Sequence, residues 1–200
     1  MTESAEESEG DLATRRGIET DLYEPAEDSL LLAETAEDLL TADDRVLDVG
    51  TGSGFVAARI ADRVGARVVG ADLNPHACRR AAAAGIPAVR ADLVGPFRDG
   101  VFDAVTFNPP YLPADEEAER DDWMEVALTG GESGRAVIDP FLDDVGRVLA
   151  PDGVVLLLAS TLSGLDEIRE RAARRGFTGD VVVEESFPFE RLVVFALRRR

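Results

Sequence analysis

VLDVGTGSG, residues 46–54, is a short apolar run that leads directly into a glycine-rich turn. The apolar run is typical of a buried strand, and the residues that follow, Phe55 to Ile60, are typical of a helix. Glycines let the backbone approach a ligand closely, and the start of a helix offers unpaired N–H groups. The stretch therefore predicts a strand, a loop that binds a nucleotide-like ligand, and a helix. A purely structural turn is the alternative.

The spacing of the glycines excludes two common nucleotide loops. The dinucleotide fingerprint G-x-G-x-x-G would need glycine at position 55, where the chain has Phe55, and no Gly-Lys-Ser/Thr of a P-loop follows. Instead, Asp48 precedes Gly50 and Gly52 in the pattern D-x-G-x-G-x-G. A carboxylate repels a pyrophosphate but attracts a cation. S-adenosylmethionine (SAM) carries a sulfonium and an ammonium group, so we expect Asp48, Gly50 and Gly52 to bind SAM.

Acidic residues also end the next two predicted strands. Asp72 lies about twenty residues past the glycines, where a carboxylate can accept hydrogen bonds from both ribose hydroxyls. Asp92 ends the third strand and, with the backbone of Leu93, could meet the amino edge of an adenine. Each aspartate could instead cap the helix or turn that follows it. Their common position at strand ends favours a shared cofactor site.

Asn108-Pro109-Pro110-Tyr111 follows the fourth predicted strand. Two consecutive prolines cannot donate to a sheet, so the chain must turn here. The turn leaves a carboxamide, backbone carbonyls and a phenol at the end of a strand. Such oxygens accept the hydrogens of a planar –NH2 group, and an aromatic ring packs on its face. We expect Asn108, Pro109 and Tyr111 to hold such a group beside the cofactor, with Asn108 near both; an ordinary proline-rich loop is the alternative.

Strands and helices alternate along the chain, which predicts a mostly parallel sheet with helices on both faces. We expect helices at 27–40, 54–63, 75–84, 135–149 and 164–175, and strands at 45–50, 67–72, 87–91, 102–107, 154–160, 181–185 and 192–197. A short connection makes the last two strands an antiparallel pair. The expected fold is α/β, a doubly wound sheet with the last strand antiparallel. Ligands bind such sheets beyond the carboxyl ends of the strands.

The composition is that of an acidic globular chain. The 200 residues are 45% hydrophobic and carry a net charge of −19, and all 21 basic residues are arginine. We expect an acidic, disordered tail at residues 1–19 and one domain at residues 20–200. Such a surface repels itself at low salt, which indicates a halophilic origin. It also lacks the basic face of a nucleic-acid reader, so nucleic acid is an improbable partner.

Several other classes of protein and site are excluded. No stretch is long enough to span a membrane, and the acidic start is not typical of a signal peptide, so we expect a cytoplasmic protein. Cys78 and His76 are the single cysteine and histidine, which leaves no disulfide, no catalytic triad and no expected metal site. We expect Cys78 to be buried and His76 to lie in the first turn of a helix.

The chain resembles the class I SAM-dependent methyltransferases that modify planar nitrogens. The resemblance rests on residues 48–54, on Asp72 and Asp92, and on residues 108–111. YEPAEDS, residues 23–29, resembles the start of HemK-type protein glutamine N5-methyltransferases, and residues 123–134 also fit that family. The closest resemblance is to the archaeal and eukaryotic branch that acts on translation termination factors. It implies a seven-stranded sheet, with Ser29 at a position that contacts the methionine end of SAM.

The resemblance further implies a substrate and a partner. The substrate would be the glutamine of the Gly-Gly-Gln loop in a class 1 release factor. The partner would be a small zinc-binding activator subunit, forming a heterodimer. The third strand is expected at an edge of the sheet, so Ile86–Ala91 could accept a partner strand. Adenine N6- or other exocyclic-amine methyltransferases of RNA or DNA share the Asn-Pro-Pro-Tyr motif and are the alternative. A non-catalytic SAM-binding subunit is a third reading.

Overall fold

The computed structural model describes residues 27–111, 130–131 and 133–200. These residues contain a seven-stranded sheet in the order β3-β2-β1-β4-β5-β7-β6. The strands are β1 (Arg45–Val49), β2 (Arg67–Asp72), β3 (Ala88–Arg90), β4 (Phe102–Phe107), β5 (Leu149–Ser160), β6 (Phe177–Ser186) and β7 (Arg191–Arg199). Strand β7 runs antiparallel to β5 and β6, and the other pairs are parallel. The predicted fold class is confirmed, as is the edge position of β3.

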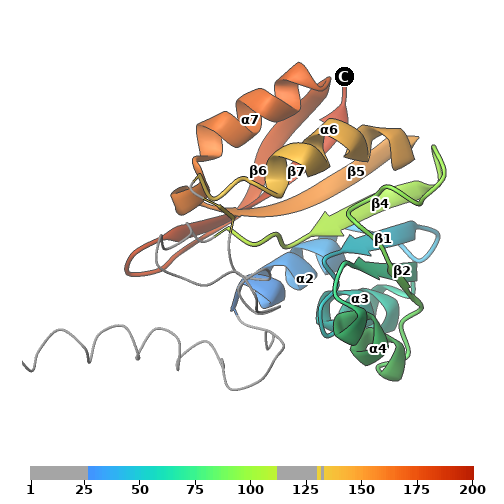
Figure 1. Ribbon diagram of the computed structural model, residues 1–200. Coiled ribbons are helices and arrows are strands. Elements are labelled where there is room, and N and C mark those ends of the chain that lie inside the picture. Colours follow the sequence, from blue (N-terminus) through green and yellow to red (C-terminus); the bar gives the residue numbers. More distant parts are fainter. Residues whose placement is uncertain (1–26, 112–129, 132) are drawn as a thin grey trace, which may run out of the picture.

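Helices cover both faces of the sheet (Figure 1). They are α2 (Glu27–Leu39), α3 (Phe55–Arg59) with a π-helical turn (Ile60–Val64), α4 (Pro75–Ala83), α6 (Ile138–Val148), a 3-10 turn (Thr161–Ser163) and α7 (Leu165–Arg174). Helices α2, α3 and α4 lie on one face, and α6 and α7 lie on the other. Residues of one strand alternate between these layers: in β1, Val46 packs with α2 and α3, whereas Leu47 and Val49 pack with α6 and α7.

Local sequence explains where two of the helices form. Helix α4 begins after Asn74, whose side chain accepts a hydrogen bond of 2.8 Å from the backbone N–H of His76, and Pro75 occupies the first turn. His76 therefore lies where the sequence predicted. Helix α6 places Ile138, Phe141, Leu142 and Val145 on one buried face at helical spacing.

Some boundaries differ from the prediction. Strand β5 begins at Leu149, because Leu149 pairs with Phe102 before the register shifts at the Pro-Asp-Gly segment. Helix α6 begins at Ile138 instead of 135, and β6 begins at Phe177 instead of 181. The prediction of a buried Cys78 is wrong: it is half-buried, with its Sγ 3.5 Å from the carbonyl of Asp72. The predicted tail at 1–19 and the segment 123–129 lie outside the described residues.

No helix in the described part of the chain is long and apolar enough to cross a membrane.

Candidate active site

The register of the central strands brings the predicted site residues to one rim. Val49 at the end of β1 pairs with Ala71 of β2 and Phe107 of β4. The residues that follow these three, Gly50, Asp72 and Asn108, therefore leave the sheet at the same level. The rim extends to β3, because the N–H of Ala91 donates a hydrogen bond of 2.9 Å to the carbonyl of Asp72. Strands far apart in the sequence thus present their carboxyl ends together (Figure 1).

The glycine loop follows β1 and is closed by Asp72. Gly50, Gly52 and Gly54 have φ values of 63°, 54° and 83°, a region that glycine adopts at little cost. The N–H of Gly52 donates a 2.9 Å hydrogen bond to one carboxylate oxygen of Asp72, and the N–H of Asn74 donates a 2.8 Å bond to the other. Burial raises the pKa of Asp72, although both N–H groups favour its charged form. Each oxygen keeps a lone pair, so Asp72 can hold the loop and still accept ligand hydroxyls.

Gly54 is required by packing as well as by its backbone angle. A Cβ at this position would lie 3.0 Å from the Cα of Ala81 in α4. The absence of a side chain therefore lets the start of α3 lie directly against α4, which sets the direction in which the helix leaves the loop.

Asp48 lies beneath the loop. It is only 2% exposed, and its carboxylate accepts hydrogen bonds of 2.7 Å from the hydroxyls of both Thr51 and Thr106. Burial raises the pKa of Asp48 to about 6, and the two hydroxyls offset part of that rise. Asp48 therefore links the glycine turn to β4 through these two hydroxyls. Its carboxylate lies beneath the glycine loop and is not on the protein surface.

The other half of the site is the turn after β4, which contacts the start of α2. The Nδ2 of Asn108 donates a 3.2 Å hydrogen bond to the Oγ of Ser29. The hydroxyl of Tyr111 donates a 3.3 Å bond to a carboxylate oxygen of Asp28. Tyr111 is 7% exposed and packs among apolar residues of α2 and the sheet. Two polar contacts thus attach the helix to the proline turn.

The Oδ1 atom of Asn108 is buried and accepts no hydrogen bond within the described part of the chain. Ser29 fixes the orientation of the carboxamide by accepting from Nδ2, so the oxygen is the atom that remains available. The backbone carbonyl oxygen of Asn108 would lie 3.8 Å from a Cβ added at Gly50. Asn108 therefore lies beside the glycine loop. The strand end therefore offers an unused acceptor next to the predicted cofactor loop.

A second glycine segment packs against the proline turn. A Cβ at Gly134 would lie 2.8 Å from the carbonyl oxygen of Tyr111 and 3.1 Å from the Cα of Ser163. The N–H of Ala136 closes this segment with a 2.8 Å bond to the carbonyl of Gly130. The segment therefore brings the 3-10 turn that follows β5 close to Tyr111.

Asp92 and Leu93 lie after β3. The side chain of Asp92 is exposed, and its carbonyl accepts a 3.2 Å hydrogen bond from the N–H of Gly95. Leu93 has φ 49° and is the residue other than glycine with positive φ in the described ranges. Such a backbone is unfavourable for leucine and is typical of a functional loop. The strand register and the Ala91–Asp72 bond place the predicted strand-end residues along one rim, and the cofactor and acceptor roles of all the predicted site residues stay predictions.

Sequence reasoning missed Asp28, Thr51 and Thr106. Asp28 stands in the YEPAEDS stretch but had no assigned role, whereas it accepts from Tyr111. Thr106 is a polar residue between Val105 and Phe107 in β4 and is fully buried. That pattern signals a buried partner without identifying it. Within residues 27–111, 130–131 and 133–200, no group of three or more His, Cys, Asp or Glu side chains could hold a metal ion.

Comparison with known proteins gives consistent matches. The family described as a methyltransferase domain matches residues 46–131. The chain is 34% identical to a protein of Methanocaldococcus jannaschii that is named as an N5-glutamine methyltransferase, over 88% of this chain and 91% of that protein. It is 32% identical to the methyltransferase HEMK2 of Homo sapiens, over 90% of each chain.

A solved structure agrees with these matches. It is the Mtq2–Trm112 complex of E. cuniculi, described as responsible for methylation of the eRF1 translation termination factor. The match has a TM-score of 0.76 and 30% sequence identity, and it covers 90% of this chain and all of the other chain.

Proposed function

Because the chain belongs to the family of protein N5-glutamine methyltransferases, we propose that it methylates the glutamine side-chain amide in the Gly-Gly-Gln loop of a class 1 translation termination factor. Family membership rests on relatives at 34% and 32% identity that are matched over most of their length. The enzyme is a SAM-dependent methyltransferase, and the similar E. cuniculi protein belongs to a complex that methylates eRF1.

The rim residues fit SAM as the cofactor. Asp72 keeps free lone pairs beside the loop for the ribose hydroxyls, and the left-handed Gly50 and Gly52 let the backbone approach the methionine part. Asp48 adds negative charge below the loop, which favours the cationic groups of SAM. The Leu93 backbone and Asp92 would receive the adenine. When bound, SAM supplies an electrophilic methyl group.

One observation carries the assignment of the acceptor side: the buried Oδ1 of Asn108 has no hydrogen-bond partner in the described residues. Leaving a buried carbonyl unpaired costs about 1–3 kcal/mol. The cost is understandable if a substrate N–H completes the site. Ser29 supports this reading, because its contact with Nδ2 turns the oxygen of Asn108 away from the helix start.

The chain's own residues would act by orientation. The lone pair of an amide nitrogen is delocalised into its carbonyl group, so the amide is a weak nucleophile. Asn108 Oδ1 and the carbonyl of Pro109 would accept its two N–H bonds, which aligns the nitrogen and lets it pyramidalise. Tyr111, held by Asp28, would pack on the planar group. A neutral acceptor at position 108 avoids the desolvation cost of a carboxylate, and most of the rate would come from positioning and fixed dipoles.

The charge of the chain supports a protein substrate over nucleic acid. The net charge is −19, which opposes the binding of a phosphate backbone. This observation favours glutamine over the exocyclic amine of a base, although both are planar nitrogens that the same turn could hold.

We also propose that a small activator subunit, which the family resemblance implies is zinc-binding, pairs with the edge strand β3; the similar protein Mtq2 forms a complex with Trm112. Among the residues near this edge, Val89 is 40% and Leu73 is 45% exposed, so the edge presents apolar side chains to solvent in the isolated chain. The exposure is confined to the middle of the expected segment, because Ile86 and Ala91 are buried. A partner strand paired to β3 would cover Val89 and use the unpaired backbone of the edge.

The proposal is tested with the chain co-purified with its Trm112-like partner, tritiated SAM, and a release factor from the same organism. A release factor in which the glutamine of Gly-Gly-Gln is replaced by asparagine is the matched control. We expect label in the wild-type factor alone, and a mass increase of one methyl group on the Gly-Gly-Gln peptide. Equal labelling of the asparagine form, or label found in nucleic acid, would overturn the proposal.

A further inference from the structure

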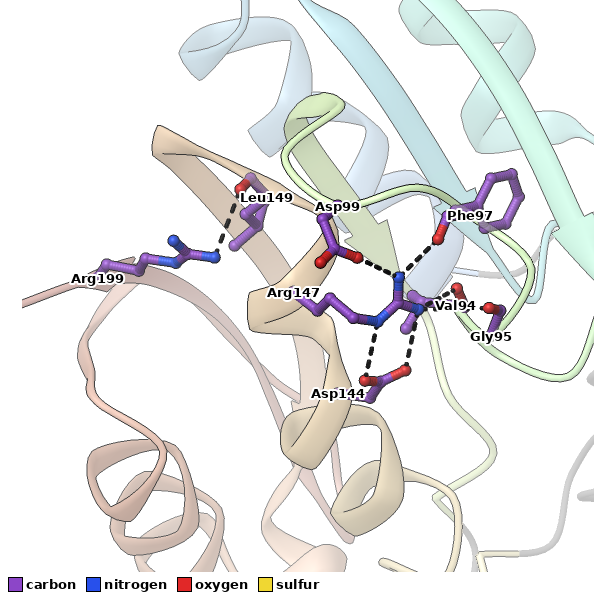
Figure 2. A network of polar contacts seen from close by, with 8 residues as sticks. All are labelled: Val94, Gly95, Phe97, Asp99, Asp144, Arg147, Leu149 and Arg199. Carbon is purple, nitrogen blue, oxygen red and sulfur yellow. Dashed lines mark hydrogen bonds and ion pairs between the residues drawn. The ribbon is translucent and has the colours of Figure 1, made fainter.

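Arg147, in the last turn of α6, holds the loop between β3 and β4 (Figure 2). Its Nη1 donates hydrogen bonds of 2.6 Å to the carbonyl of Phe97 and 2.8 Å to the carboxylate of Asp99. Its Nη2 donates to the carbonyls of Val94 and Gly95, at 3.1 and 3.4 Å. One guanidinium therefore contacts four residues of the loop between positions 94 and 99, through three backbone carbonyls and one carboxylate.

A carboxylate on the same helix fixes the direction of this guanidinium. Asp144 accepts from the Nε and Nη2 of Arg147, at 3.2 and 3.3 Å. A backbone hydrogen bond also joins the loop to α6: the N–H of Gly100 donates a 3.0 Å bond to the carbonyl of Arg147. All the donor nitrogens of Arg147 are thus engaged, which requires the planar, five-donor fork of arginine.

The loop that Arg147 holds is the continuation of the segment that carries Asp92 and Leu93. Leu93 has φ 49°, a backbone that leucine does not adopt without support from its surroundings. Val94, the next residue, is fully buried, and its carbonyl is one of the acceptors of Arg147. The strained residue is therefore anchored directly on its C-terminal side by α6.

We propose that Arg147 is a positioning residue for cofactor selection: it fixes the Val94–Asp99 loop so that Asp92 and the backbone of Leu93 meet the amino edge of adenine. Arg147 would act through the loop, because its side-chain hydrogen bonds to the loop go to residues 94, 95, 97 and 99 and not to Asp92 or Leu93. The inference deepens the proposed function and rests on it, because it assumes that SAM places its adenine at Asp92 and Leu93.

The test compares the affinity for S-adenosylhomocysteine with that for S-inosylhomocysteine, in which oxygen replaces the adenine amino group. Calorimetry is carried out on the full chain with its partner, for the wild type, Arg147→Gln and Arg147→Lys. We expect Arg147→Gln to lower the preference for the adenine form roughly tenfold, and kcat at saturating SAM to stay close to the wild-type value. Lysine keeps the charge but not the fork, so Arg147→Lys should recover only part of the preference.

Arg171→Gln is the matched control. Arg171 of α7 makes a two-pronged contact with Asp143, also on α6, but does not touch the loop. We expect it to leave the preference unchanged. Asp144→Asn is a milder variant, and it should lower the preference less than Arg147→Gln does.

Three results would have distinct meanings. If Arg147→Gln and Asp144→Asn keep the wild-type preference, or if Arg171→Gln loses as much as Arg147→Gln, the positioning role is wrong. If the wild-type chain binds both compounds equally, the adenine site itself is misplaced and the inference falls with it. If the wild type discriminates but methylates no release factor, the proposed substrate fails while the role of Arg147 is still decided by the variants.

Discussion

The Nδ2 of Asn108 lies 3.2 Å from the Oγ of Ser29, a contact between a strand end and a helix start that are 79 positions apart in the chain. The contact decides which end of the carboxamide stays available, because the amide nitrogen is bound and the oxygen is left without a partner in the described residues.

Replacing Asn108 by alanine should separate binding from turnover. The change removes the acceptor Oδ1 but leaves Asp72 and the glycine loop intact, so we expect SAM affinity close to wild type. Loss of a preorganised acceptor should lower kcat by about 10²–10³. Ser29→Ala, which removes only the group that orients the carboxamide, should cause a smaller loss. Weakened cofactor binding with intact turnover at saturation would contradict the assignment.

Asp72→Ala should have the opposite effect from Asn108→Ala: it should weaken SAM binding and leave kcat nearly unchanged. The change removes the predicted ribose acceptor and the two bonds to the N–H groups of Gly52 and Asn74. We expect cofactor affinity to fall about tenfold or more, with little change in the rate at saturating SAM. Calorimetry and steady-state kinetics on the same preparation check both parts. A lower kcat with unchanged affinity would mean that Asp72 acts on the substrate side.

Asp48→Asn should change how stability depends on pH. Burial raises the pKa of Asp48 to about 6 from its ordinary value of 3.8, so the fold favours the protonated form. The protonated Asp48 side chain therefore contributes fully to the stability of the fold below about pH 4, and this contribution is lost as the pH rises through 6. Asparagine stays neutral, so the variant should gain up to roughly 3 kcal/mol relative to wild type between pH 4 and 8. The melting temperatures of both proteins are measured across this pH range. A difference between them that does not change with pH would refute the burial of a titrating carboxylate at position 48.

Val89→Asp should prevent assembly with the activator subunit. Val89 is 40% exposed on the edge strand β3, so a carboxylate there should leave the isolated chain folded but oppose an apolar partner strand. Val182→Asp is the matched control, because Val182 is 42% exposed on β6 at the opposite edge of the sheet. Co-purification is the measurement. Loss of the partner with both variants, or with neither, would place the partner elsewhere.

Salt should stabilise the fold. The net charge of −19 produces self-repulsion that counterions screen, and the Debye length falls to about 3 Å at molar salt. We expect the melting temperature to rise steadily from dilute to molar KCl. A melting temperature that does not change over this range would argue against a halophilic origin.

Much of this architecture is readable from local patterns. The bounds of β2 and β4 match the predicted strands, because both are largely apolar runs that end at a turn signal: Asp72 before a helix that Asn74 caps, and Asn108 before two prolines. The antiparallel β6–β7 pair is expected from their short connection, and the edge position of β3 from the sheet order that the family resemblance implies. Strand β5 extends beyond its prediction because its first residues pair with Phe102, a contact that no local signal announces.

The sequence by itself determined which residues stand at strand ends, because apolar runs, glycines and prolines act on the backbone within a few residues. The tertiary structure decided what those residues do to one another. Asp48 meets Thr106 across 58 positions through the register of β1 against β4. Arg147 meets the loop after β3 because α6 packs over it. Hydrogen bonds of this kind depend on distances between separate elements, and only the packing of the sheet and its helices sets those distances.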